Sequence, residues 1–223
     1  MIKISTPTPF SSGGNRDCFV HPENPHRCLK VLREGRSPRE RRKQKKFPAN
    51  LRPLATFDEN ITELQTLSYI FKAYPPRIHQ YVARAYGFVL TDRGSAIETD
   101  LIRDSNGLIS MTLEQHLWKF GLNPQIKQAL TDFLNDWSSQ APTTRAFIPH
   151  NLLLQETTGS LRIQIIDGLG RQSRYMKFLQ TLPFYNRFEK RKANLYKRIQ
   201  RISDLLEQGI QPPKRVANLK REF

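Results

Sequence analysis

Residues 11–31 read SSGGNRDCFVHPENPHRCLKV, and this stretch predicts a β-hairpin. Residues 15–20 and 27–31 alternate in polarity and carry Phe, Val, Cys and Leu, as strands of a half-buried sheet do. The segment HPENPH between them is rich in turn-forming residues. The hairpin therefore anchors an antiparallel sheet in the N-terminal part of the chain.

Two features of the hairpin indicate an anion site. Gly13 and Gly14 lack side chains, so the backbone there can approach a phosphate closely or adopt positive φ. Lys30 lies inside the apolar run CLKV, where a lysine without a partner is costly to bury. We therefore expect Lys30 to have a carboxylate partner, a phosphate partner, or both.

The remaining pattern predicts an α+β fold in which more strands and several helices come after the hairpin. The expected elements are a helix over 58–73 capped by Asp58, strands over 84–90 and 95–101, helices from Thr112 and from Pro124, a second hairpin of 150–155 and 161–170, and a basic amphipathic helix over 183–208. The tail after Gly209 contains Pro212-Pro213, and we expect it to fray. These elements suggest a sheet-rich half (1–103), a helical half (104–182) and a basic helix with its tail (183–223).

The formal net charge of +16 is concentrated in two segments of the 223-residue chain. Residues 33–46, expected to form a loop, contain eight basic and two acidic side chains, and residues 171–223 contain fourteen basic and four acidic ones. Such runs are either solvated surface or contacts for an acidic partner or nucleic acid, and the sequence leaves both alternatives open. No apolar run is long enough for a membrane span and the N-terminus lacks a secretory pattern, so a cytoplasmic protein is expected.

A zinc site is a less favoured alternative for the hairpin. Cys18, His21, His26 and Cys28 are all zinc-type ligands within eleven residues. If the hairpin forms, however, the cysteines lie in the strands and the histidines in the turn, where the four cannot easily converge. Two small buried thiols and a polar turn are the favoured explanation of these residues.

Further along the chain, two oxygen-bearing side chains are expected at the base of the second hairpin. Asn151 precedes its first strand, and Asp167-Gly168 comes after its second strand. Such oxygen ligands suit Mg²⁺. A Gly-Gly loop, a strand lysine, an asparagine and an Asp-Gly pair succeed one another in this order in protein kinases. The helix over 58–73 supplies a carboxylate for Lys30, with Glu63 the preferred partner and Glu59 the second choice.

Over roughly residues 10–170 the chain resembles the bacterial PhoP regulatory network protein YrbL family, whose members look like reduced protein kinases. The resemblance rests on GGNRDCFVHPENPHRCLKV, on the segment after Tyr86-Gly87, and on HNLLL with IIDGLG. It implies a kinase-like fold with an antiparallel-sheet N-lobe and a small, reduced helical C-lobe. It also implies that Lys30 contacts the phosphates of ATP, that Asn151 and Asp167 hold magnesium, and that residues 98–103, beginning with Glu98, form the adenine-contacting hinge.

One position departs from the kinase pattern. In TRAFIPHN, Ala146 stands where kinases have the aspartate that orients the acceptor hydroxyl and takes its proton. The catalytic group is therefore unknown. The sequence predicts ATP and magnesium binding, with phosphotransfer in doubt: a pseudokinase or an atypical transferase with a regulatory role. The alternative is a basic nucleic-acid- or polyanion-binding protein on a degenerate kinase-like scaffold.

Overall fold

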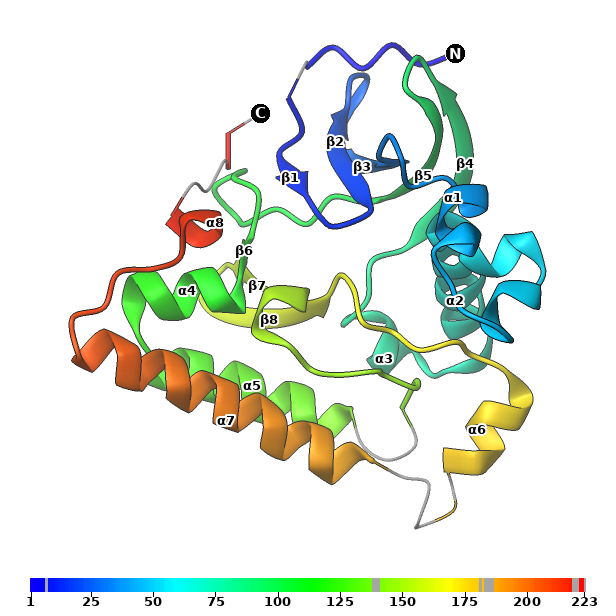
Figure 1. Cartoon of the computed structure of the whole chain (residues 1–223). Coiled ribbons are helices and arrows are strands. Elements are labelled where there is room, and N and C mark those ends of the chain that lie inside the picture. The colour runs from blue at the N-terminus through cyan, green and yellow to red at the C-terminus, as the bar shows by residue number, and fades with distance from the viewer. Residues whose placement is uncertain (7, 138–140, 181, 183–186, 218–220, 223) are drawn as a thin grey trace. The chain divides into compact units, whose positions relative to one another are not determined.

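The computed structural model describes the chain except residues 7, 138–140, 181, 183–186, 218–220 and 223 (Figure 1). The described residues form two compact units. The first comprises Met1–Ser68 and Arg84–Leu101, and the second comprises Tyr69–Ala83 and Ile102–Glu222.

The first unit is built on a five-stranded antiparallel sheet with the strand order β1-β2-β3-β5-β4. Its strands are β1 (Ser11–Ser12), β2 (Arg16–His21), β3 (Asn24–Leu32), β4 (Ala85–Thr91) and β5 (Gly94–Asp100). The predicted hairpin is confirmed as β2 and β3, although its turn is shorter than the expected HPENPH because both strands continue into that segment. The strands predicted over 84–90 and 95–101 are confirmed as β4 and β5 to within one residue.

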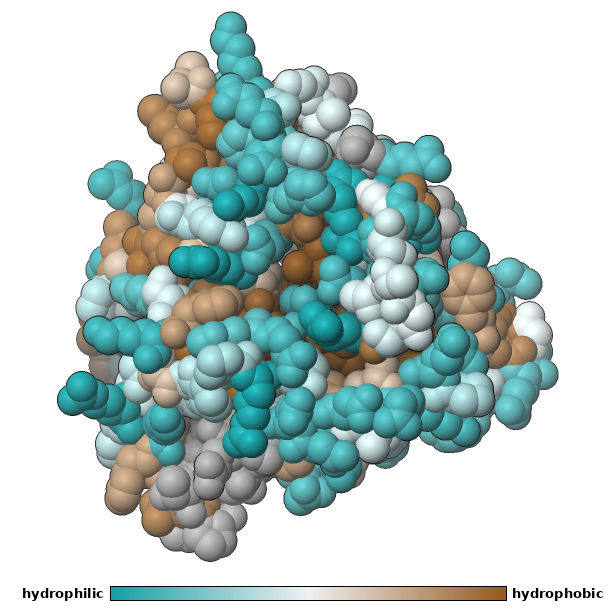
Figure 2. All heavy atoms as spheres, turned by 180° about the vertical axis from the view of Figure 1, so that it is seen from behind, coloured by the Kyte–Doolittle hydropathy of each residue, from teal (hydrophilic) through white to brown (hydrophobic). Residues whose placement is uncertain are grey.

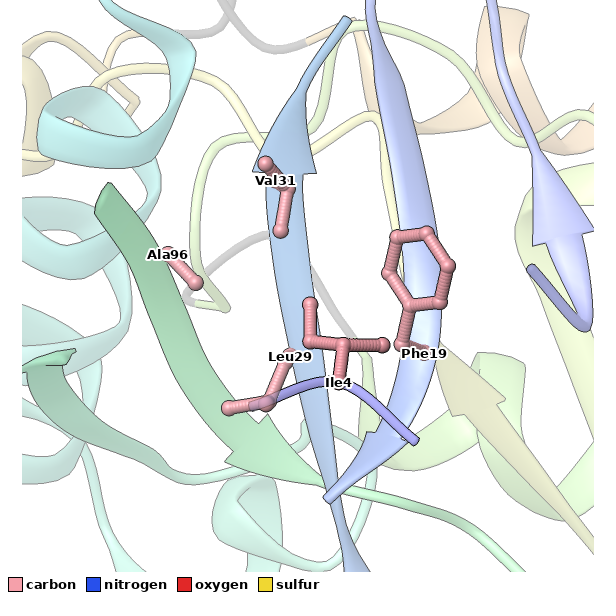
Figure 3. Close-up of a cluster of buried hydrophobic side chains, with 5 residues drawn as sticks. All are labelled: Ile4, Phe19, Leu29, Val31 and Ala96. Carbon is pink, nitrogen blue, oxygen red and sulfur yellow. The ribbon is translucent and has the colours of Figure 1, made fainter. Parts of the chain in front are cut away.

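One face of this sheet forms a hydrophobic core (Figure 3). Phe19 pairs with Leu29, Val31 pairs with Ala96, and Ile4 from the N-terminal segment packs over them. Because side chains alternate between the faces of a strand, Lys30 points away from this core. Strand β4 lies at one edge of the sheet, and this edge is partly apolar. Figure 2 shows hydrophobic surface at its upper left, over β4, where Phe88 and Leu90 are exposed.

The basic segment expected to be a loop contains a short helix, so that expectation was wrong. Helix α1 (Pro38–Lys43) begins with a capping box, in which Ser37 accepts from the Glu40 backbone and Glu40 accepts from the Ser37 backbone. Two 3₁₀ turns come next, η1 (Ala49–Leu51) and η2 (Leu54–Phe57). The capping box explains why a segment without apolar periodicity becomes helical.

Helix α2 (Glu59–Ala73) begins in the first unit and ends in the second. The backbone N–H groups of Asn60 and Ile61 donate to Asp58, which confirms the predicted cap. The Asn60 side chain donates to the carbonyl of Lys30 at 3.1 Å. This bond fixes the first turn of α2 against the strand that carries Lys30.

The second unit combines a three-stranded antiparallel sheet, ordered β6-β7-β8, with several helices. Its elements are α3 (Pro76–His79), β6 (Met111–Thr112), α4 (Leu113–Phe120), α5 (Pro124–Asp136), η3 (Pro149–Asn151), β7 (Leu152–Thr157), β8 (Ser160–Ile165), α6 (Arg174–Gln180), α7 (Phe188–Glu207) and α8 (Lys214–Ala217). The second hairpin is confirmed, but its strands are shorter than expected, since η3 precedes β7 and β8 ends at Ile165. The part of the predicted helix over 183–186 lies outside the described residues.

Aromatic and aliphatic side chains fill the core of the second unit. Phe133 of α5 contacts Trp137 and Phe147, with ring centroids about 5.5 Å apart. Helix α7 buries Leu195 and Ile199 on one face and packs against α4. The amphipathic pattern of this basic helix is thus used for packing inside the unit.

The C-terminal tail does not fray throughout, contrary to expectation. Arg221 forms an ion pair with the buried Asp104 and donates to the carbonyl of Ile109. Helix α8 packs against α4, and Val216 is buried. A buried carboxylate needs a partner, and the tail supplies one.

The α+β prediction, with an antiparallel sheet in the N-terminal part and mainly helices after it, is confirmed. No helix in the described parts of the chain has the length and apolarity needed to cross a membrane.

Candidate functional site

Lys30 of β3 is held by Glu63 of α2. The Nζ atom of Lys30 lies 2.5 Å from Oε1 of Glu63, and both side chains are largely buried. Lys30 reaches Glu63 because it projects from the face of the sheet opposite the apolar core, and Glu63 lies one turn beyond the anchored start of α2. The predicted pairing with Glu63 rather than Glu59 is confirmed.

A second cation, Arg16 of β2, shares Glu63 with Lys30 and was not predicted as part of the site. Arg16 forms an ion pair with Glu63, and its Nε lies 3.6 Å from Glu59. Glu59 in turn binds Arg41 of α1 at 2.9 Å. The signal in the sequence was a second basic residue at the start of the hairpin, but spacing alone did not show that it faces α2.

These contacts fix the charges of the pair. Burial alone would raise the pKa of Glu63, but the nearby charges of Lys30 and Arg16 outweigh it, so that the pKa is lowered. Burial would likewise lower the pKa of Lys30, but Glu63 outweighs it and the pKa is raised. Both side chains are therefore ionised at neutral pH.

Cys18 and Cys28 lie on the same face of the hairpin as Lys30. Cys18 pairs with Lys30 across the strands, and Cys28 precedes Lys30 by two positions on β3. A hydrogen bond with Cys28, opposed by burial and aided by Lys30, lowers the pKa of Cys18 to about 7. His21 accepts from the Glu23 backbone in the turn. Within the described ranges, no group of three or more His, Cys, Asp or Glu side chains is placed to hold a metal ion.

The predicted phosphate loop, Gly13 and Gly14, links β1 to β2. Gly13 donates from its backbone N–H to the carbonyl of Arg16 at 2.8 Å, and its own carbonyl accepts from Arg33. Neither glycine adopts positive φ, and a side chain on Gly14 would meet no atom within 4 Å. Glycine is therefore not required here by backbone conformation. Without a side chain at position 14, a ligand can approach the backbone from the open space beside it.

Asn151 and the Asp167-Gly168 turn are neighbours in the second unit. Ile166 donates from its backbone to the carbonyl of Asn151, which aligns the ends of β7 and β8. Gly168 has φ +86°, and a Cβ on it would lie 3.1 Å from both the Asn151 amide nitrogen and the Ala146 carbonyl. The close approach therefore requires glycine at 168. The Asp167 carboxylate accepts from the Gly168 backbone at 2.6 Å.

Asn151 and Asp167 are the residues at this turn that could hold a magnesium ion. A carboxylate oxygen from Asp167 and an amide oxygen from Asn151 are hard ligands, and Mg²⁺ is commonly bound by one or two such groups plus phosphate oxygens. The main chain also places Ala146 at this turn, because Arg145 donates to the carbonyl of Gly168 at 2.7 Å. The methyl group of Ala146 can neither accept nor donate a proton there.

Glu98, the first residue of the segment expected to contact adenine, lies in β5 opposite Leu29. Its carboxylate lies 4.0 Å from Arg27. Residues 98–101 belong to the first unit and 102–103 to the second, so the segment contains one of the points at which the chain passes from one unit to the other.

Comparison with known proteins identifies a family. The model of the family described as PhoP regulatory network protein YrbL matches residues 2–203. The uncharacterized protein YrbL of Escherichia coli is 28% identical over 180 residues, which are 78% of this chain and 75% of that protein. The YrbL protein of Shigella flexneri matches with the same identity and coverage.

Among solved structures, kinase domains resemble the chain. The Rio2 kinase of Chaetomium thermophilum, solved as an ADP/Mg²⁺-phosphoaspartate complex, is 15% identical, with a TM-score of 0.45 over 94% of this chain and 59% of that one. A variant of the PknI kinase domain of Mycobacterium tuberculosis is 14% identical, with a TM-score of 0.47 over 96% of this chain and 77% of that one. Likeness at TM-scores below 0.5 says nothing about activity.

Proposed function

Because the chain belongs to the PhoP regulatory network protein YrbL family, we propose that it is a kinase-like protein that binds ATP together with Mg²⁺. The observation that carries the proposal is the Lys30–Glu63 ion pair. A lysine on the third strand of an antiparallel sheet, paired with a glutamate of the next long helix, is the arrangement with which kinases hold the α- and β-phosphates.

In this proposal, Lys30 neutralises phosphate charge and Glu63 keeps its ammonium group in place. Lys30 has three N–H donors, and Glu63 Oε1 takes one of them in the structure. Gly13 and Gly14 cover the phosphates with backbone, since Gly14 has open space around it. Glu98 lies in the segment that would contact the base.

Asn151 and Asp167 would hold the magnesium ion, which would offset the negative charge of the phosphates. The tight Gly168 turn fixes the direction of the Asp167 carboxylate, because the Gly168 backbone donates to it. Support for this role comes from the hard oxygen chemistry of the two side chains and from their adjacent placement.

Ala146 restricts the chemistry that a bound nucleotide can undergo. Transfer to a hydroxyl group is assisted in kinases by an aspartate that this chain lacks at the corresponding position. We therefore propose nucleotide binding as the primary activity, with phosphotransfer slow or absent and a regulatory role for the bound state.

The test is thermal unfolding with and without millimolar ATP and magnesium. The wild type should unfold at a temperature several degrees higher with ligand, since a ligand at 100 times its Kd stabilises the native state by about 2.7 kcal/mol. Lys30→Ala and Asp167→Ala should each lose this shift, while the exposed controls Lys3→Ala and Asp132→Ala should retain it. Each variant is compared with itself without ligand, so a lower intrinsic stability does not affect the result. A wild type that shows no shift would sink the proposal.

A further inference from the structure

Helix α1 and the turns after it form an open pocket in the first unit, apart from Lys30. Its volume is about 560 Å³, within the range of small-ligand sites. The lining residues are Arg39, Arg42, Lys43, Asn50, Leu51 and Leu54. Three cations at helix positions i, i+3 and i+4 therefore face one concave surface.

Among the described residues, the three cations that line this pocket have no salt-bridge partner, although Glu40 of the same helix interacts electrostatically with Lys43. Arg39 and Lys43 are exposed, and no ion pair is formed by them or by Arg42 in the part of the chain that the structure describes. Arg41, on another side of the same helix, pairs with Glu59 and so serves the fold. The pocket cations therefore remain available to an anionic ligand.

The pocket also contains a hydrogen-bond acceptor, the side chain of Asn50, to which an anion without an N–H or O–H group cannot donate. Asn50 lines it, and its backbone carbonyl accepts from Arg42 Nε at 2.9 Å, which ties the turn to α1. The side-chain oxygen of Asn50 is buried without a hydrogen-bond partner among the described residues. A buried acceptor left unpaired costs free energy, and because this oxygen is closed to solvent, a ligand N–H or O–H group would gain the bond once the Asn50 side chain turns toward the pocket. Nucleotides carry both such donors and phosphate groups.

An aromatic side chain follows the pocket cations by a few positions in the sequence. Phe47 comes directly after Lys45-Lys46 and is 78% exposed, and Leu51 on the pocket lining is 68% exposed. Phe47 is not among the residues that line the pocket, but it belongs to the same basic segment, and an exposed aromatic ring is the kind of surface on which bases of single-stranded nucleic acids stack. Helix α1 itself has only six residues and no apolar face, which disfavours insertion into a lipid surface.

We propose that this pocket binds single-stranded nucleic acid, with Arg39, Arg42 and Lys43 on successive phosphates, Asn50 on a base or ribose donor, and a base stacked on Phe47. The site uses none of the residues proposed to hold ATP and magnesium. Its occupancy is therefore independent of the nucleotide-binding proposal.

The experiment is fluorescence anisotropy of a labelled oligouridine of about 12 nucleotides, titrated with the full chain at several salt concentrations. The test variant is Arg39→Gln with Lys43→Gln, and its matched control is Lys3→Gln with Lys72→Gln, which removes the same charge from exposed positions elsewhere. The test variant should bind more than tenfold more weakly, and its slope of log K against log salt should be shallower by about 1.4, because two phosphate contacts are lost. The dissociation constant of the control should lie within about twofold of the wild-type value, because a substitution at a distant surface position has only a small effect on binding.

Phe47→Ala provides a second variant that does not depend on charge. It should weaken binding about fivefold or more with the salt slope unchanged, since stacking involves no counterion. Equal binding by the test variant and its charge-matched control would overturn the proposal. Loss of binding to phosphatidylserine vesicles in the test variant, with oligouridine binding intact, would overturn it in favour of a lipid surface.

Discussion

Lys30 and Glu63 form a buried ion pair at 2.5 Å between a strand and a helix, and Glu63 accepts from Arg16 as well. One carboxylate therefore serves two buried cations. Its removal would leave both without their main partner, which is far more costly than losing an exposed pair.

We expect Glu63→Gln to lower the free energy of unfolding by about 3 kcal/mol in urea titrations at neutral pH. Glu59→Gln, in which a carboxylate that is 31% exposed is lost and Lys30 keeps its partner, should cost about 1 kcal/mol or less. Because the pKa of Glu63 is lowered in the folded state, its contribution is present above pH 4.5 and is lost as pH falls through the folded pKa. The difference between wild type and Glu63→Gln should thus shrink in acid. Equal costs for the two variants would contradict this picture.

Gly168→Ala should both destabilise the fold and impair magnesium-dependent nucleotide binding. Its φ of +86° disfavours alanine, and the added Cβ would crowd Asn151 and the Ala146 carbonyl. Gly159→Ala is the matched control, since Gly159 has φ +83° in a β-turn but open space around it. The control should lose about 1–2 kcal/mol from its backbone alone, and Gly168→Ala should lose more. Measurement of unfolding free energies, and then of the ATP thermal shift, separates the two effects.

His116 of α4 should make the stability of the protein depend on pH between 4 and 6.5. Burial, with Arg221 and Lys119 nearby and Asp104 opposing them, lowers the pKa of His116 from 6.5 to about 4. The unfolded chain therefore binds more protons in this interval, so stability falls as pH drops through it. In His116→Phe, the curve of unfolding free energy against pH should flatten between these values. A curve parallel to that of the wild type would show that His116 does not stay neutral.

Arg221→Ala should cost about 3 kcal/mol of unfolding free energy, although it lies near the C-terminus. The substitution leaves Asp104, whose side chain is 1% exposed, without its cation. Lys214→Ala, an exposed change in the same tail, should be nearly neutral. If both changes prove neutral in denaturant titrations, the tail does not dock as the structure describes.

Local patterns predicted much of this molecule. The alternation around Phe19 and Leu29 indicated the hairpin, the position of Lys30 within it indicated an ionic partner, and the helical spacing after Asp58 brought Glu63 within reach. The Asp167-Gly168 turn was likewise predicted, because a short apolar strand is followed there by an aspartate and a glycine.

The features that the sequence did not predict depend on long-range contacts or on overlooked caps. Arg221 and Asp104 are 117 positions apart, and no periodicity connects them. Arg16 was visible as a basic residue, but its contact with α2 depends on how the helix is anchored by Asn60. The capping box of Ser37 and Glu40 is a sequence pattern that could have predicted helix α1. It was overlooked because the run of charged residues around it was interpreted as a loop.

The ion pairs of Arg41, Glu59, Arg16, Glu63 and Lys30 form a continuous chain in which three cations share two carboxylates. The cluster thus carries one positive charge more than it can neutralise within itself. A phosphate bound beside Lys30 would offset this surplus, and the same cluster would resist a cationic ligand. The unpaired charge of this cluster, in addition to the shape of the loop, therefore favours an anion over a neutral or cationic ligand beside Lys30.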